Sequence, residues 1–434
     1  MSYLSRQLVT SALAANAIKP VPGAAASVPA MFAGWLVSEL APHVIAGTLV
    51  DTVLEVRRTR GRSAAPLLGL LNSLALAHVT QQGRRSQAAF ERGLDEGLGG
   101  DHLDRLRQEY DDLDWRTPLR QLVWPFRLPV PGVEVVKDLT YAPGHGRRGR
   151  LDVYRPEGGT EGGAQGRPVL LQVHGGAWTI GEKDHQGLPL MKHMASRGWV
   201  CVAPNYRLSP RVAFPEHLVD VKRAIAWIRE NIAEHGGDPS FVAITGGSAG
   251  GHLAALAALT PNDPEYQPGF EDVDTTLQAA VPFYGVYDFA GVTGSKAALR
   301  MRDRFLARRV LFSDPEEDLE PFEKGSPLLR VGPHAPPFYV IHGANDTLVE
   351  VAQARAFVAA LREATDQPVA YTELAGTQHA FDVFPSVRSQ HSVRSAERFL
   401  RWAWASRTGE QTHAAADWER SDPIDDTARE GSGR

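Results

Sequence analysis

Cysteine is almost missing from this 434-residue sequence, and basic residues are not concentrated in any part of it. The single cysteine, Cys201, excludes an intrachain disulfide and a metal site built from several thiolates. It lies in the apolar run WVCVAP, which predicts a buried structural thiol. The 46 basic and 51 acidic residues are scattered along the chain, so we expect no surface for nucleic acid.

A hydrophobic segment suited to cross a membrane is also missing. Residues 20–38 are uncharged, but Pro20, Pro22 and Pro29 interrupt them. The first twenty residues have one arginine before a weakly apolar run and no clear cleavage site, so no signal peptide is predicted. We therefore expect a protein that is cytoplasmic or peripherally associated with the cell envelope.

Patterns that bind metals or phosphates are missing as well. The 15 histidines include no H-E-x-x-H motif. The glycine-rich ITGGSAGG has neither the G-K-[ST] ending of a phosphate loop nor a G-x-G-x-x-G pattern. The sequence predicts no metal and no cofactor.

The pattern that is present changes near residue 126. Residues 1–125 read as several helices with few strand signals, a helical N-terminal region. From 126 to 407, short apolar strands alternate with helices, which predicts an α/β domain with a doubly wound, mostly parallel sheet. The first two strands flank APGHGRRGR and indicate an antiparallel hairpin. Residues 408–434 are polar and predicted to be disordered.

The pentapeptide GGSAG places Ser248 between the strand-like FVAIT and the helix-like AGGHLAALAAL. In a chain with 41 glycines the pentapeptide alone is a modest signal, but a strand before it and a helix after it are the context of a nucleophile elbow. Side chains two residues away on either side would collide in such a turn, which explains Gly246 and Gly250. Ser248 is therefore the predicted nucleophile.

Downstream residues supply the partners that a nucleophilic serine needs. Asp346 in HGANDTLV and His379 in GTQHAFD each follow a predicted strand, in the chain order Ser, Asp, His. His379 would take the proton from Ser248, and Asp346 would orient the imidazole. The rival acids fit less well, because Asp382 is too near His379 to come from a separate loop and Asp288 follows an earlier strand.

Two glycines upstream provide candidate oxyanion donors. Gly175 and Gly176 end the strand in VLLQVHGGAW, where backbone without side chains can turn its amides toward a substrate carbonyl. With the amide of Ala249 they form the predicted oxyanion hole. The alternative is a simple glycine turn after a buried strand.

The motifs HGGAW, NYRLSP, GGDPSFVAITGGSAGGHLA, HGANDTLV and GTQHAFD, in this order within residues 133–407, resemble the hormone-sensitive-lipase-like esterases of the α/β-hydrolase fold. The resemblance implies a catalytic triad of Ser248, Asp346 and His379, the three oxyanion amides named above, and no cofactor. The long N-terminal part is similar to that of a subgroup of actinobacterial lipases and esterases, some of them associated with the cell envelope.

We accordingly expect a serine carboxylesterase that hydrolyses short- to medium-chain esters of small molecules through an acyl-enzyme. Many family members carry HGGG where this chain has HGGAW. The HGGAW form is also similar to that of kynurenine formamidases. An amidase acting on N-formylkynurenine is therefore one alternative. A non-catalytic interaction module that has kept the fold is another. The oligomeric state and the physiological substrate are not indicated by the sequence.

The N-terminal region admits two interpretations. Leu67, Leu70, Leu71 and Leu74 recur at the spacing of one helical face, after Pro66 at a first helical position. This stripe predicts an amphipathic helix packed on an apolar partner. Residues 1–125 would then form a cap over the active-site mouth, which we favour, or a surface that contacts lipid.

Overall fold

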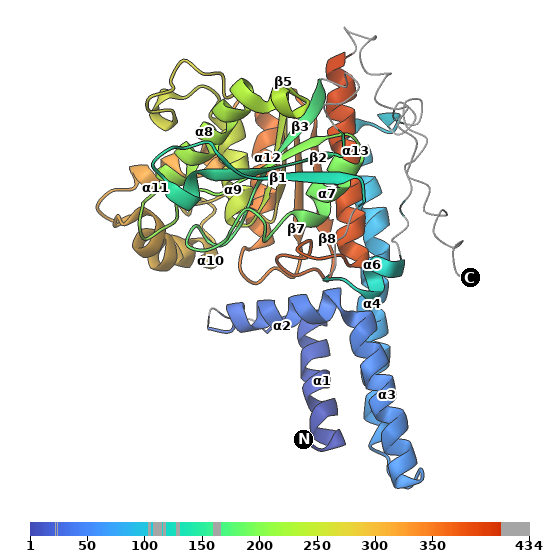
Figure 1. Cartoon of the computed structure of the whole chain (residues 1–434). Coiled ribbons are helices and arrows are strands. Elements are labelled where there is room, and N and C mark those ends of the chain that lie inside the picture. The colour runs from blue at the N-terminus through green and yellow to red at the C-terminus, as the bar shows by residue number, and fades with distance from the viewer. Residues whose placement is uncertain are drawn as a thin grey trace, which may run out of the picture.

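The computed structural model describes residues 1–21, 23, 25–102, 106, 115, 119–126, 131–158 and 166–408. Of the segment 408–434 that is predicted to be disordered, only Thr408 lies among these residues, and it is helical; the rest lies outside them. Within them the chain forms one eight-stranded sheet of order β1-β2-β4-β3-β5-β6-β7-β8 (Figure 1). The strands are β1 (Val133–Thr140), β2 (Arg150–Pro156), β3 (Arg167–Val173), β4 (Val200–Pro204), β5 (Gly237–Gly247), β6 (Ala279–Phe283), β7 (Phe338–Gly343) and β8 (Val369–Leu374).

The strand pairing confirms the predicted mixed topology. β1 pairs with β2 and β2 with β4 in antiparallel register, and all remaining neighbours are parallel. The central strands are buried on both faces, as expected for apolar runs in a parallel sheet. Cys201 in β4 is fully buried, as predicted, and burial raises the pKa of its thiol.

Helices cover both faces of the sheet. One core contains side chains of α8 (Glu216–Asn231), α9 (Ala249–Leu259) and α12 (Val351–Ala364). The other contains side chains of α7 (Leu188–Ser196) and α13 (Val387–Thr408). The segment after β6 holds α10 (Lys296–Arg300), a π-helix (Met301–Leu311) and α11 (Glu320–Lys324). The doubly wound α/β architecture is confirmed.

The N-terminal region is helical, with α1 (Tyr3–Ile18), α2 (Ser27–Glu39), α3 (Ala41–Thr59), α4 (Pro66–Leu98) and the short α6 (Leu119–Val123). α1, α3 and the first half of α4 extend away from the sheet, and α2 lies across their base (Figure 1). The second half of α4 packs on the edge strand β8, where Phe90 and Leu94 join the core of α7 and α13.

The predicted role of the leucine stripe on α4 is wrong. Leu67, Leu70, Leu71 and Leu74 are all exposed, by 49 to 68%. The buried face of this half of α4 instead contains Pro66, Gly69, Asn72, Leu76 and Val79. At Gly69 the space that a Cβ would occupy is filled by the hydroxyls of Thr52 and Tyr3, so a small residue decides which face approaches the neighbouring helices.

Candidate active site

The four strands β5, β6, β7 and β8 are neighbours in the sheet and parallel. Ser248 follows β5, Tyr284 follows β6, Asp346 follows β7 and His379 follows β8. Because the carboxyl ends of parallel strands meet at one edge of a sheet, these loops converge at the same place. The site is therefore assembled from segments far apart in the sequence.

Ser248 occupies a strained turn between β5 and α9. Its φ of 59° and ψ of −122° are rarely adopted by a residue with a side chain. A Cβ at Gly246 would collide with the carbonyl of Gly250, and one at Gly250 with the carbonyl of Val173. The glycines are required by this close approach of backbone, as the pentapeptide predicted.

His379 and Asp346 meet directly. His379 Nδ1 lies 2.6 Å from Asp346 Oδ2, and both side chains are almost completely buried. The other oxygen, Asp346 Oδ1, accepts hydrogen bonds from the amides of Leu348 and Val349 at 2.8 and 2.9 Å. The orientation of the carboxylate is thus fixed, and His379 meets it through Nδ1 rather than Nε2.

A second histidine also faces this carboxylate. His342 Nε2 lies 3.4 Å from Asp346 Oδ2 and 3.0 Å from the carbonyl oxygen of Val349. Burial alone would raise the pKa of Asp346, but His379 and His342 together hold that pKa well below its ordinary value. Asp346 is therefore ionised at neutral pH.

The rival acids have other partners. Asp382 accepts a hydrogen bond from the Tyr284 hydroxyl, and burial raises the pKa of both groups. Asp288 accepts hydrogen bonds from the amides of Gly291, Val292 and Thr293. Neither pairs with His379.

Tyr284 is a site residue that the sequence analysis missed. Its ring centroid lies 4.5 Å from that of His379, and the missing Cβ of Gly247 leaves room for its hydroxyl. Its φ of 37° is again unusual for a residue with a side chain. Tyr284 follows a strand without a recognisable motif, so only the adjacency of β6 and β7 could have indicated it.

The HGGAW loop lies beside Ser248. Gly175 approaches so closely that a Cβ on it would lie 3.2 Å from Ser248 Cβ. Its amide donates to Gln186 Oε1 at 2.8 Å, so Gly175 would have to exchange this acceptor for a substrate oxygen. Gly176 has a φ of 123°, and Ala249 begins α9, where the first amides have no partner within the helix.

The tryptophan of HGGAW is part of the core. Trp178 is 2% exposed and donates through Nε1 to Nδ1 of His252 on α9, at 3.2 Å. Its ring also packs edge-on against Phe289. Burial lowers the pKa of His252 to about 3, so the imidazole is neutral and can accept this hydrogen bond. Trp178 thereby joins the loop to the nucleophile helix, whereas the residue at the fourth position of HGGG is Ala177, whose φ is 51°.

The N-terminal helices reach the catalytic loops. Asn345 Nδ2 donates to the carbonyl oxygen of Ile18 at the end of α1, at 3.1 Å. Thr347 Oγ1 donates to the carbonyl oxygen of Ser27 at the start of α2, at 2.8 Å. The residues on both sides of Asp346 therefore hold the junction of α1 and α2.

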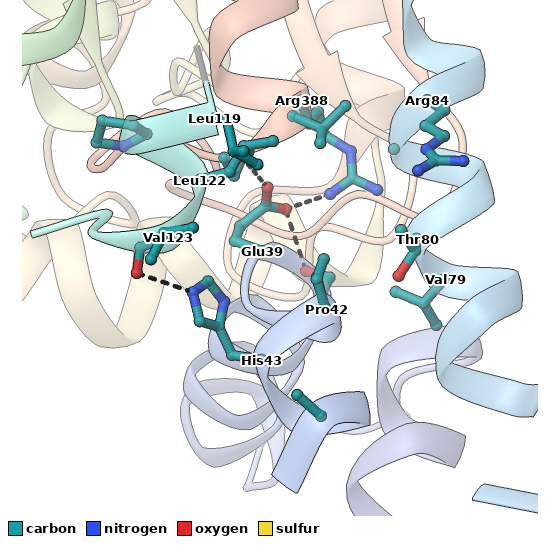
Figure 2. A pocket seen from close by; sticks show the side chains of 16 residues that line it. Glu39, Pro42, His43, Val79, Thr80, Arg84, Leu119, Leu122, Val123 and Arg388 are labelled. Atoms are coloured by element: carbon teal, nitrogen blue, oxygen red, sulfur yellow. Dashed lines mark hydrogen bonds and ion pairs between the residues drawn. The ribbon is translucent and has the colours of Figure 1, made fainter. Parts of the chain in front are cut away.

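A separate cavity of 340 Å³ lies at the base of these helices, lined by residues of α2, α3, α4, α6 and the start of α13 (Figure 2). In its wall the buried Glu39 forms an ion pair with Arg388 and accepts a hydrogen bond from Ser386 at 2.6 Å. None of the described residues that line it is Ser248, Asp346 or His379. The cavity is thus distinct from the catalytic loops.

The fold and the position of these loops define an α/β-hydrolase. The solved esterase of Thermogutta terrifontis with bound propionate is 27% identical and has a TM-score of 0.52. It covers 63% of this chain and 94% of its own, so about a third of this chain has no counterpart in it.

Two mycobacterial relatives match almost the whole chain. The "Probable carboxylic ester hydrolase LipM" of Mycobacterium tuberculosis is 42% identical, over 92% of each chain. "Esterase LipQ" of the same organism is 49% identical, over 87% of this chain and 85% of its own. The BD-FAE family matches residues 151–361. The chain belongs to the hormone-sensitive-lipase-like esterases and is a carboxylic ester hydrolase.

Metal sites and membrane-spanning helices are two further features to consider for the described residues. They contain no group of three or more His, Cys, Asp or Glu side chains suited to hold a metal ion. None of their helices is by itself long and apolar enough to cross a bilayer, whereas α2 and α3, which meet at a bend of 80°, reach that length and composition together.

Proposed function

We propose that the protein hydrolyses short- to medium-chain carboxylic esters of small molecules through an acyl-enzyme on Ser248. The observation that carries the proposal is the 2.6 Å contact of His379 Nδ1 with Asp346 Oδ2, in loops that converge on the strained turn of Ser248. Propionate and butyrate occupy solved relatives that are 27 and 28% identical, which supports a short acyl group.

In the first half of the reaction, Ser248 Oγ attacks the ester carbonyl and its proton passes to His379 Nε2. The carbonyl oxygen becomes an oxyanion, to which the amides of Gly176 and Ala249 donate, joined by Gly175 once it releases Gln186. The C–O bond then breaks, and His379 returns the proton to the leaving alcohol. Water repeats these steps on the acyl-enzyme and releases the carboxylic acid and free Ser248.

The test is a series of p-nitrophenyl esters of increasing acyl length, assayed with the wild type and Ser248→Ala. We expect the variant to lose roughly 10⁴-fold or more in kcat, because triad members act as a unit. A fluorophosphonate probe should label the wild type and leave Ser248→Ala unlabelled. Wild-type turnover in the variant would overturn the assignment.

The formamidase alternative rests on the HGGAW form of the loop. Trp178 of this loop is buried against His252 and Phe289, a packing contact that distinguishes neither substrate class. Parallel assays of N-formylkynurenine and the ester series separate the two. Faster turnover of N-formylkynurenine than of every ester would favour the amidase.

In this proposal residues 126–407 are the catalytic domain, and α2 is a cap beside the catalytic loops. The contacts of Asn345 and Thr347 with α1 and α2 support the cap. The leucine stripe of α4 is exposed, so it gives no reason to include α4 in a cap over the active-site mouth. Its exposure supports the second interpretation of residues 1–125, contact with lipid.

A further inference from the structure

The far end of the N-terminal helices has a polar interior. We define this N-terminal bundle as α1, α3 and residues 66–80 of α4. Inside it, buried Asn72 donates to the carbonyl oxygen and to Oε1 of Gln7, at 2.9 and 3.0 Å, and accepts from Ser11. Tyr3 and Thr52 share a hydrogen bond of 3.1 Å between their buried hydroxyls.

The outside of the same segment is apolar. Most of the exposed large apolar side chains of the described chain belong to residues 1–74, and those of the bundle are 37 to 68% exposed. On its three helices they include Leu4, Leu8 and Val9 of α1, Val50, Val53 and Leu54 of α3, and Leu67, Leu70, Leu71 and Leu74 of α4. A helix that packs in water shows the opposite pattern, with its apolar face inside.

The inversion is confined to the end that points away from the sheet. Near the sheet the bundle has an ordinary apolar interior that includes Ala14, Ala41, Leu76 and Val79. Helices that associate in lipid use small residues and side-chain hydrogen bonds at their contacts, as Gly69 and Asn72 do here. The far end is therefore built for an apolar surrounding.

The charged residues near the far end of the bundle indicate the kind of apolar partner that it contacts. The end of α3 and the turn that follows it carry the exposed Arg57, Arg58, Arg60 and Arg62. Residues 1–80 contain six basic and three acidic residues, whereas the whole chain has a net charge of −5. Each of the three acids is paired, Asp51 with Arg6, Glu55 with Arg58, and Glu39 with Arg388 outside the bundle. The unbalanced charge at this end is positive and complements anionic lipid headgroups.

We propose that the far end of the N-terminal bundle inserts into the surface of a lipid bilayer that carries anionic headgroups. The exposed leucines and valines enter the hydrocarbon, and the arginines of the turn reach the headgroups through their long side chains. A second copy of the chain would cover only one side of the bundle. Because exposed apolar side chains lie on all three helices, a lipid surface covers them better than a dimer contact.

Insertion also sets the direction of the catalytic loops. The junction of α1 and α2 is held by Asn345 and Thr347, so the bundle extends from the side of the sheet that carries Asp346. In Figure 1 the bundle points away from the sheet on that side. The loops that carry the catalytic residues therefore face the lipid surface.

The test is vesicle sedimentation of the full-length chain with phosphatidylcholine vesicles and with mixed phosphatidylcholine and phosphatidylglycerol vesicles. We expect the wild type to bind the mixed vesicles, and Leu67→Ser, Leu71→Ser and Leu74→Ser together to weaken binding by about tenfold or more. The matched control changes Val292, Leu319 and Leu329 of the catalytic domain to serine, since these side chains are also exposed. It should bind like the wild type.

Additional variants measure the contribution of charge, and light scattering tests a second copy of the chain as the alternative partner. Arg57→Gln, Arg60→Gln and Arg62→Gln together should weaken binding to the mixed vesicles and make it less sensitive to salt. Ser248→Ala should bind fully, so a failed esterase assignment leaves this test intact. The proposal is overturned if the leucine variant binds like the wild type, if the wild type binds neither vesicle, or if light scattering shows a wild-type dimer that the leucine substitutions dissociate without affecting vesicle binding.

Discussion

The carboxylate of Asp346 is held by four groups, two backbone amides and two imidazoles. Asp346→Asn keeps the shape of the side chain but replaces an oxygen acceptor and removes the charge. We expect kcat to fall by roughly 10³- to 10⁴-fold with little change in KM, because the imidazole of His379 is left in the wrong tautomer. Steady-state kinetics with a soluble p-nitrophenyl ester measures this.

Asp288→Asn is the matched control. Its carboxylate binds the amides of the turn after residue 290 and does not contact His379. We expect a loss of stability with kcat within a few fold of the wild type. Equal losses of kcat in the two variants would contradict the role of Asp346.

Among single residues, the sequence predicted those whose position depends only on chain order and on the end of a strand. Asp346 and His379 follow strands that become neighbours, so their meeting could be anticipated. Tyr284, His342 and Gln186 could not be, because each acquires its role from register and packing between strands or loops, and no motif marks it.

At the scale of elements, α4 shows how a helix face is chosen. The leucine stripe had the correct helical period, but periodicity does not say which side of a helix faces the rest of the molecule. Gly69 and Asn72 mark the true contact face, since small residues permit close approach and an amide side chain needs buried partners. Small residues also mark the contact face in the second half of α4, where Gly93 and Gly97 lie directly against β8.

Gly97→Ala is expected to lower the free energy of unfolding by about 1–3 kcal/mol. Its Cβ would overlap the backbone of Ala370 in β8, so the helix would have to move off the strand. The same substitution at Gly47 in α3 meets open space, and there we expect a gain of up to about 1 kcal/mol from helix propensity. Urea unfolding of both variants gives the two signs, and a gain at Gly97 would contradict the packing described for α4.

At the scale of the whole molecule, buried histidines make stability depend on pH. Burial lowers the pKa of His174 to about 4 and the pKa values of His217 and His252 to about 3, from an ordinary 6.5. The folded protein keeps these imidazoles neutral, whereas the unfolded chain takes up protons below pH 6.5. Their contribution is complete above that pH and decreases as the pH falls toward 4, by about 1.4 kcal/mol per pH unit for each group.

Urea unfolding at pH 7.5 and 5.5 tests this. The free energy of unfolding should be clearly lower at pH 5.5, and His217→Asn should reduce the difference between the two values. His185→Asn is the control, because this side chain is 63% exposed and its substitution should leave the difference unchanged. Equal stability of the wild type at both pH values would contradict the expectation.

The contact of α4 with β8 and α13 also orders events during synthesis. Phe90 and Leu94 leave the ribosome early, but their neighbours in the core include Ala370 and Leu400, which are translated near the end. Contacts between the two ends of a chain form late and slow folding. The second half of α4 therefore lacks these partners while the segments up to β8 and α13 are made, and this side of the sheet is completed only when α4, β8 and α13 pack together.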